Sequence, residues 1–247
     1  AGAQAQVRSS LRDSVAAVGG RVIVTYRPAG GGAAARIKGQ PAVSAMEGQA
    51  ITGRLASEGK LRSPRRLDLL GGASGQVNTT ELAALLADPS VESVEPDVWV
   101  PLLETRDATA LETGNQAQST PWGITRVQAP EAWAIVGRGE GIKVAIMDSG
   151  GDIDHPDISW AGGYNVMSQS TAPADWDDNI SVCNGHGTHV AGTVAARDND
   201  IGVVGVAPGV SIYALKVFRD VNGSCGAYVS DQIYGLEWAV ANGVRVV

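Results

Sequence analysis

The sequence lacks long apolar runs, has few cysteines and carries few basic residues in its second half. None of its 247 residues falls in a run of about 18 apolar residues, so we expect no membrane-spanning helix. Its two cysteines, Cys183 and Cys225, permit one disulfide at most. Residues 117–247 carry 14 acidic and only 7 basic side chains, whereas residues 1–116 carry 12 of each. This acidic second half argues against nucleic acid as a partner and favours the binding of cations.

The composition and length indicate a globular protein with two modest domains. Apolar residues make up 44% and charged residues 18% of the chain, which is typical of globular rather than disordered proteins. In the first half, periodicity predicts strands over residues 21–27, 66–70 and 91–97, and helices over residues 44–61 and 78–87. A capping box of Asn78 and Glu81 opens the second helix. This order of elements predicts a small α+β sandwich.

The second half alternates strands and helices, which is typical of a parallel sheet covered on both faces. Residues 141–147 predict a buried strand that runs directly into Asp148. A strand near residues 210–217, a helix over residues 228–242 and a strand from residue 244 follow. Because chemistry in such sheets collects at the carboxyl ends of strands, Asp148 is a candidate functional residue.

His186 is the second candidate, because it opens a helix that is rich in small residues. A helix N-terminus favours neutral imidazole. A base placed there therefore needs a carboxylate, such as that of Asp148, to stabilise the cation that forms when it accepts a proton. Gly187 lets other backbone approach the helix closely, and Gly192 in mid-helix predicts that something packs tightly against that turn.

Five short motifs of the second half occur in the order found in one family of proteases. They are Asp148-Ser149-Gly150, Asp154-His155-Pro156-Asp157, Gly185-His186-Gly187-Thr188-His189, Gly205-Val206-Ala207-Pro208 and Glu237-Trp238-Ala239. Together they resemble the subtilisin-like serine proteases, the subtilase family or peptidase S8. The resemblance implies that Asp148 is the triad aspartate and His186 the general base of a serine endopeptidase.

Residues 87–97 resemble the end of a subtilisin propeptide, a ferredoxin-like α+β domain that assists folding of the protease and inhibits it. The resemblance implies an α/β protein in which this propeptide domain precedes an incomplete, doubly wound parallel-sheet catalytic domain. We expect a flexible N-terminus at residues 1–19 and the propeptide at residues 20–101. A linker with the maturation site at residues 102–116 and the N-terminal part of the catalytic domain at residues 117–247 follow. The same resemblance implies a secreted, extracellular protein.

The nucleophilic serine of the family has no counterpart in the sequence. Neither a Gly-Thr-Ser-Met-like motif nor a G-x-S-x-G elbow occurs, and residues 223–226 are no such elbow. We therefore expect these residues to be the first portion of a longer precursor and to be inactive alone. The expected partners are protein or peptide substrates, the propeptide as intramolecular inhibitor and folding aid, and the remainder of the catalytic domain.

The resemblance also implies a calcium site, a disulfide and a substrate-binding segment. Oxygen ligands suit calcium. In some members of the family, a cysteine just before the Asn-Gly-His motif forms a disulfide with the loop after the next strand. The calcium ligands would be the side chains of Gln118, Asp157 and Asn199 with the carbonyls of Arg197, Ile201 and Val203; the disulfide would join Cys183 to Cys225; and the substrate-binding residues would be Gly223, Ser224, Cys225, Gly226, Ala227 and Tyr228.

Several alternatives stay open at this point. Asp175, Asp177 and Asp178 form an acidic segment that is a candidate second cation site. His186 and His189 suggest zinc, but helical zinc pairs usually lie four residues apart. An aspartic protease needs a second Asp motif, which is missing. The alternative function is a non-enzymatic inhibitor or propeptide module, or an inactive protease fragment.

Overall fold

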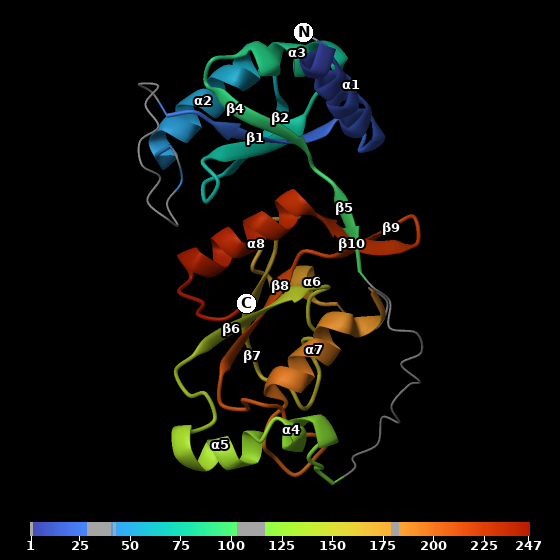
Figure 1. Cartoon of the computed structure of the whole chain (residues 1–247). Coiled ribbons are helices and arrows are strands. Elements are labelled where there is room, and N and C mark those ends of the chain that lie inside the picture. The colour runs from blue at the N-terminus through green and yellow to red at the C-terminus, as the bar shows by residue number, and fades with distance from the viewer. Residues whose placement is uncertain (1, 29–40, 42, 103–116, 179–182) are drawn as a thin grey trace. The chain divides into compact units, whose positions relative to one another are not determined.

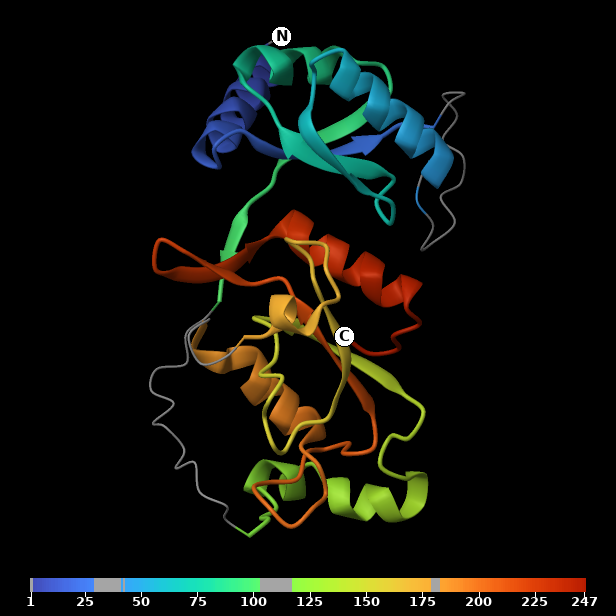
Figure 2. The same cartoon turned by 180° about the vertical axis from the view of Figure 1, so that it is seen from behind.

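The chain divides into two compact units in its computed structural model, which describes residues 2–28, 41, 43–102, 117–178 and 183–247. Unit 1 comprises residues 1–100 with 228–237, and unit 2 comprises residues 101–227 with 238–247. Figures 1 and 2 show the elements of both units from opposite sides. Within the described residues, no helix has both the length and the apolar character needed to cross a membrane.

Unit 1 is built on an antiparallel sheet of four strands in the order β2-β3-β1-β4 (Figure 1). Leu55, Leu82 and Leu85 bring two helices onto the buried Val22 and Val24 of the sheet. The elements are α1 (Gly2–Ala17), β1 (Arg21–Tyr26), α2 (Ala45–Ser57), β2 (Arg62–Leu67), β3 (Gly72–Gln76), α3 (Thr79–Ala87) and β4 (Val91–Pro96). From β1 onward, the order of elements is therefore strand, helix, two strands, helix, strand.

The capping box predicted before α3 is confirmed. The side chain of Asn78 accepts hydrogen bonds from the amides of Thr80 and Glu81, both at 2.9 Å. In return, the Asn78 amide donates to the Glu81 carboxylate at 2.6 Å. These bonds supply partners for amides that the helix itself leaves unpaired, which is why the helix begins at this point.

Strand β3 was not predicted, because its sequence Gly-Ala-Ser-Gly-Gln has none of the β-branched or aromatic residues that favour strands. Its glycines are needed for close packing in the middle of the sheet. A Cβ atom at Gly72 would lie 2.1 Å from the carbonyl oxygen of Val24, and one at Gly75 would lie 2.6 Å from Leu61 Cδ1. Strand β2 also begins earlier than the predicted residues 66–70.

The expectation of a flexible N-terminus at residues 1–19 is wrong, because α1 occupies Gly2–Ala17. Val15, which is 3% exposed, belongs to the apolar core of unit 1, and Leu11 packs against that core. These two residues lie one helical turn apart, so they form a short apolar row on one face. Such a short row is too weak a periodic signal to predict a helix from sequence.

A buried carboxylate follows α3 and is paired with two cations. The side chain of Asp88 is 1% exposed and accepts two bonds of 2.9 Å from the Arg54 guanidinium. Lys60 Nζ donates a third bond at 2.7 Å. The Arg54 guanidinium, together with Lys60, holds the pKa of Asp88 far below its ordinary value. This ion pair ties α2 to the end of α3.

The depressed pKa of Asp88 makes the stability of unit 1 dependent on pH. Its contribution is fully present above the ordinary carboxyl pKa of about 4 and is lost as the pH falls towards the depressed value. We expect Asp88→Asn to lower the free energy of unfolding of unit 1 by about 2–3 kcal/mol at pH 7. The difference from wild type should shrink between pH 5 and pH 3, as measured by hydrogen exchange of the β1 amides. Glu95 on β4 is exposed, so the control Glu95→Gln should change the free energy of unfolding by less than about 0.5 kcal/mol. A difference in stability between wild type and Asp88→Asn that grows at low pH would refute the prediction.

Unit 2 contains a parallel sheet, as the sequence predicts, and its three strands have the order β6-β8-β7. A further sheet has the order β5-β10-β9. The elements are β5 (Trp99–Pro101), α4 (Trp122–Arg126), α5 (Ala129–Val136), β6 (Lys143–Asp148), β7 (Trp160–Asn165), α6 (Pro173–Trp176), a turn at Cys183–Gly185, α7 (His186–Ala195), β8 (Ser211–Lys216), β9 (Arg219–Val221), β10 (Ser224–Tyr228) and α8 (Val229–Ala241), the last of which continues from unit 1.

The parallel sheet of unit 2 is covered on both faces. Ala191 and Ala195 of α7 form one cluster with Val144 and Ile212 of the sheet. Tyr213, whose side chain points to the opposite face because it follows Ile212 in β8, contacts Trp238 of α8 with ring centroids 6.1 Å apart. The strand predicted from residue 244 is reduced to an isolated parallel bridge between Val246 and Val144.

Candidate active site

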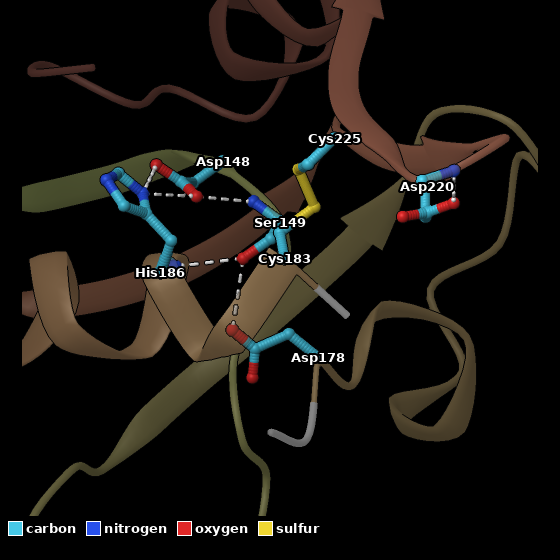
Figure 3. The surroundings of a disulfide bond; sticks show 9 residues. Asp148, Ser149, Asp178, Cys183, His186, Asp220 and Cys225 are labelled. Carbon is cyan, nitrogen blue, oxygen red and sulfur yellow. Dashed lines mark hydrogen bonds and ion pairs between the residues drawn. A yellow bond between two sulfur atoms is a disulfide. The ribbon is translucent and has the colours of Figure 1, made fainter. Parts of the chain in front are cut away.

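The structure brings Asp148 and His186 into direct contact (Figure 3). Nδ1 of His186 lies 2.9 Å from Oδ1 and 2.8 Å from Oδ2 of Asp148. Asp148 is the last residue of β6, and His186 is the first residue of α7. The Asp148 side chain is 8% exposed and the His186 side chain 26% exposed, so the imidazole is the part of the pair that solvent and ligands can reach.

The backbone before α7 determines where this helix begins and therefore where its first residue, His186, lies. Cys183, Asn184 and Gly185 all have left-handed φ angles, of 50°, 56° and 66°. This conformation costs roughly 1–2 kcal/mol for each residue that is not glycine, so the surrounding structure must hold it. Gly187 allows the close approach that the sequence predicts, because a Cβ atom there would lie 2.2 Å from the carbonyl oxygen of Gly150. The corresponding prediction for Gly192 finds no support among the described residues, since apart from its own helix backbone and chain neighbours none of their atoms lies within 4 Å of its Cβ position.

The chemistry of the two groups defines how the proton is placed. When the carboxylate is ionised it only accepts hydrogen bonds, and the partner that suits it is an Nδ1–H group of His186 that donates a hydrogen bond to it. Nε2 is then the nitrogen that can accept a proton from another group. The Asp148 carboxylate also accepts a bond of 2.7 Å from the Ser149 amide, which fixes its orientation. The pair can therefore act as a general base with a stabilised cation.

Two further buried residues, Ser149 and Asp178, were not predicted for this site. Ser149 Oγ accepts the Gly187 amide at 2.9 Å and donates to Asp178 Oδ2 at 3.2 Å. Asp178 also accepts the Thr188 hydroxyl at 2.7 Å, and burial raises the pKa of its carboxyl. The available signal was Gly185, because a helix with glycine at its N-cap needs an acceptor from elsewhere.

The three carboxylates of the acidic segment that contains Asp178 differ in their exposure to solvent. Asp178 is fully buried and occupied by side-chain and backbone donors, whereas Asp175 is exposed. Across the described parts of the chain, no group of three or more His, Cys, Asp or Glu side chains could hold a metal ion. The hypothesis of a second cation site at Asp175, Asp177 and Asp178 finds no support in this arrangement.

Cys183 and Cys225 form a disulfide, as the resemblance implies, with Cα atoms 5.5 Å apart. The bond joins the left-handed turn before α7 to strand β10 (Figure 3). Cys225 is 8% exposed, so the disulfide is largely shielded from solvent on this side. It couples the start of the His186 helix covalently to the segment predicted to bind substrate.

The predicted substrate-binding residues lie on one strand and its preceding turn. Ser224, Cys225, Gly226, Ala227 and Tyr228 form β10, and Gly223 lies in the turn before it with φ 79°. β10 pairs with β9 along one edge. The Leu102 amide donates to the Cys225 carbonyl at 2.8 Å, so an extended segment of the chain itself pairs with β10.

The residues predicted to bind calcium lie together in unit 2. The Asn199 side-chain amide donates to Asp157 Oδ1 at 2.9 Å, and the Val203 amide donates to Asp157 Oδ2 at 3.0 Å. The Gln118 side-chain oxygen accepts the Asn199 amide, and Asn199 Oδ1 accepts the Ile201 amide at 2.8 Å. The Arg197 amide donates to the Asp157 carbonyl at 2.9 Å.

The predicted ligand set of this loop consists of oxygen donors, and in this structure the side-chain oxygens of Gln118, Asp157 and Asn199 accept hydrogen bonds from N–H groups. A Cβ atom at Gly202 would lie 2.5 Å from Asp157 Oδ2, so the loop encloses the carboxylate closely. Asp157 is 4% exposed and is the only carboxylate of the predicted ligand set, in which the other donors are amide and carbonyl oxygens. One carboxylate with neutral oxygens is a donor set suited to calcium rather than to a softer metal.

Comparison with known proteins identifies the family of the C-terminal part. The model of the subtilase family, Peptidase_S8, matches residues 139–247, which contain both Asp148 and His186. This part of the chain belongs to the subtilase family.

Relatives similar to this chain include two subtilisins and an alkaline protease. Subtilisin E of Bacillus subtilis (strain 168) is 38% identical over 209 residues, covering 83% of this chain and 51% of that protein. The alkaline protease of Alkalihalobacillus alcalophilus is 40% identical over 173 residues, covering 70% of this chain and 39% of that protein. Subtilisin Savinase of Lederbergia lenta is 47% identical over 130 residues, covering 53% of this chain and 44% of that protein. This chain spans about half the length of Subtilisin E.

Proposed function

We propose that the full-length protein is a serine endopeptidase in which Asp148 and His186 are two of the three triad residues. The contact of His186 Nδ1 with both carboxylate oxygens of Asp148 carries this proposal. It holds the imidazole in the tautomer whose Nε2 accepts a proton. The third residue, a nucleophilic serine, is contributed by a part of the protein beyond residue 247.

The proposed reaction is acyl transfer to that serine followed by hydrolysis. The serine Oγ bonds to the peptide carbonyl carbon while its proton passes to His186 Nε2. The carbon–nitrogen bond then breaks, and the same proton passes to the leaving amine. Asp148 stabilises the imidazolium that exists between these transfers. Water then cleaves the acyl ester by the same proton route, which regenerates the serine.

We propose that β10 binds the substrate as an added strand on the edge that β5 occupies in this structure, after maturation has released β5 from that edge. Its backbone supplies donors and acceptors to an extended peptide, and the Leu102–Cys225 bond is an example of such pairing within the chain. Residues 223–228 would therefore contact the substrate backbone. The disulfide would keep this strand in a fixed position relative to the turn that precedes His186.

We propose that residues 20–101 are the propeptide, which assists folding and inhibits the protease, and that residues 102–116 contain the maturation site. The strand and helix order from β1 to β4, with its sheet order β2-β3-β1-β4, supports a ferredoxin-like domain. An extracellular location is part of the same proposal, as the resemblance to subtilisins implies.

We propose that the loop around Asp157 binds one calcium ion. The ion would be held by the side chains of Gln118, Asp157 and Asn199 and by the carbonyls of Arg197, Ile201 and Val203. Calcium bound there would tie the loop of residues 197–203 to the segment that contains Gln118, and its effect would be on stability rather than on a chemical step.

Removal of calcium is expected to destabilise the full-length protein. At a calcium concentration of one hundred times the dissociation constant, the ion should add about 2.7 kcal/mol to the free energy of unfolding. Thermal unfolding with calcium and with excess chelator measures this difference. Asp157→Asn should abolish it, whereas Asp200→Asn, which removes an exposed charge from the same loop, should preserve it. Identical melting curves with calcium and with chelator would refute the site.

Hydrolysis of casein by the full-length protein tests the proposed activity. We expect peptide release that a serine-directed inhibitor abolishes and that a chelator of zinc leaves in place. Residues 1–247 expressed alone should release no peptides, because they lack the proposed nucleophile. Hydrolysis by residues 1–247 alone, or no hydrolysis by the matured full-length protein, would overturn the proposal.

A further inference from the structure

Helix α7 obtains acceptors for its first amides from outside the helix. Its N-cap is Gly185, which has no side chain and makes no capping bond. The Gly187 amide donates to Ser149 Oγ at 2.9 Å, and the Thr188 amide donates to Asp178 Oδ2 at 3.2 Å. The start of the helix, and with it His186, is therefore fixed by side chains that come from other segments.

Asp178 binds both segments that carry the candidate triad residues. One carboxylate oxygen accepts the Thr188 hydroxyl at 2.7 Å, and the other accepts Ser149 Oγ at 3.2 Å as well as the Thr188 amide. Ser149 follows Asp148 directly, and Thr188 lies two residues after His186. Asp178 thus joins the turn after β6 to the first turn of α7 without a hydrogen bond to either Asp148 or His186.

These bonds close a ring around the Asp148–His186 contact. Ser149 contributes its amide to Asp148 at 2.7 Å and its hydroxyl to Asp178, so a shift of Ser149 moves the Asp148 carboxylate. Figure 3 shows dashed lines that lead from the His186–Asp148 pair through Ser149 to Asp178. Because Asp178 is fully buried, water cannot replace its bonds.

Lys216 is the positive charge that acts on the Asp178 carboxylate. Lys216, at the end of β8, is 9% exposed and donates to the Asp177 carbonyl at 2.6 Å. A Cβ atom at Gly150 would lie 3.2 Å from both Asp178 Cβ and Lys216 Cδ, so the two side chains share one packed site. The Lys216 charge attracts the Asp178 carboxylate, and Asp177 and Asp175 attract Lys216 as well.

We propose that Asp178 is a positioning residue that aligns the imidazole of His186 with the carboxylate of Asp148. The inference rests on the proposed function, in which this pair accepts a proton from the serine. Asp178 contacts neither the reacting atoms nor the substrate; it acts through Ser149 and Thr188. A displacement of reacting groups by about 1 Å can lower a rate about a hundredfold. Loss of this alignment should therefore appear as a lower kcat.

The test is Asp178→Asn in the full-length protein, compared with Asp175→Asn. Asparagine keeps the shape of aspartate, but its NH2 group is a donor that would face the hydrogen-bond donors of Ser149 and Thr188. The control Asp175→Asn removes one negative charge as well, but from an exposed side chain. We expect Asp178→Asn to lower kcat roughly tenfold to a hundredfold with little change in KM. We expect Asp175→Asn to leave both constants unchanged. An unchanged kcat in folded Asp178→Asn would overturn the proposal.

A second measurement does not depend on turnover. The Nδ1 proton of His186, assigned by its loss in His186→Gln, should give a low-field NMR signal in the wild type because it is bonded to Asp148. In Asp178→Asn this signal should broaden through exchange with water. If it stays sharp while only the melting temperature falls, Asp178 has a structural role alone.

A milder variant covers the case in which Asp178→Asn fails to fold. Thr188→Val removes the hydroxyl that donates to Asp178 and accepts a bond from the Asp152 amide at 2.8 Å, but it keeps the Thr188 amide bond and the side-chain shape. It should lower kcat in the same direction by a smaller factor, and an unchanged kcat and Nδ1 signal would count against the proposal. If the wild type hydrolyses nothing, the proposed function fails, but the Nδ1 signal still tests whether Asp178 aligns the pair.

Discussion

His186→Ala is expected to lower kcat of the full-length protein by about a millionfold, which is the size of the loss measured for the equivalent change in subtilisin itself. The reason is that, among the described residues, His186 holds the only imidazole bonded to Asp148, with Nδ1 within 3 Å of both carboxylate oxygens. Substrate binding should persist, because β10 does not depend on the imidazole. The measurement is kcat and KM on a peptide substrate after maturation.

The control for this prediction lies on the same helix. His189 is exposed and three residues further along α7. His189→Ala should leave kcat within about twofold of the wild type. Equal losses in the two variants would show that the effect comes from damage to α7. A His186→Ala variant with more than a thousandth of wild-type activity would remove His186 from the role of general base.

Loss of the disulfide is expected to destabilise unit 2 by roughly 4 kcal/mol, because it closes a loop with a sequence separation of 42 residues. Without the bond, the left-handed turn at Cys183–Gly185 loses a restraint, and the unfolded chain gains freedom. The matched variant is Cys183→Ala with Cys225→Ala. Urea unfolding at pH 7 measures the difference in the free energy of unfolding.

A reductant separates the bond from the side chains. Dithiothreitol, a dithiol, should lower the stability of the wild type to that of the double alanine variant as it is oxidised and the two cysteines become thiols. The double variant itself should not respond. A wild type that unfolds at the same urea concentration with and without reductant, with free thiols confirmed by titration, would show that the disulfide contributes nothing.

Sequence patterns located the contact between Asp148 and His186 because each lies at a position that topology constrains. A carboxylate that ends a parallel strand lies at the carboxyl edge of the sheet, and the imidazole begins a later helix, α7, that packs on the same sheet. The capping box at Asn78 was predictable for a similar reason, since it uses residues only three apart. Local chemistry and the order of elements were sufficient in both cases.

Other features depend on packing that the sequence does not reveal. Asp178 belongs to a run of acidic residues, and such a run suggests solvent or a cation, yet this carboxylate is fully buried against Thr188 and Ser149. Strand β3 forms although its composition disfavours strands, because Gly72 fits against the backbone of β1. Leu11 and Val15 hold helix α1 against the apolar core of unit 1, but these two residues alone form no periodic pattern that would predict a helix.

The central claim is that Asp148 and His186 activate a serine from another part of the protein. Mass spectrometry of the full-length protein after reaction with a fluorophosphonate, which bonds covalently to activated serines, tests this directly. We expect a single modified serine beyond residue 247 in the wild type and none in His186→Ala. Modification of a serine within residues 1–247, or a label that persists in His186→Ala, would contradict it.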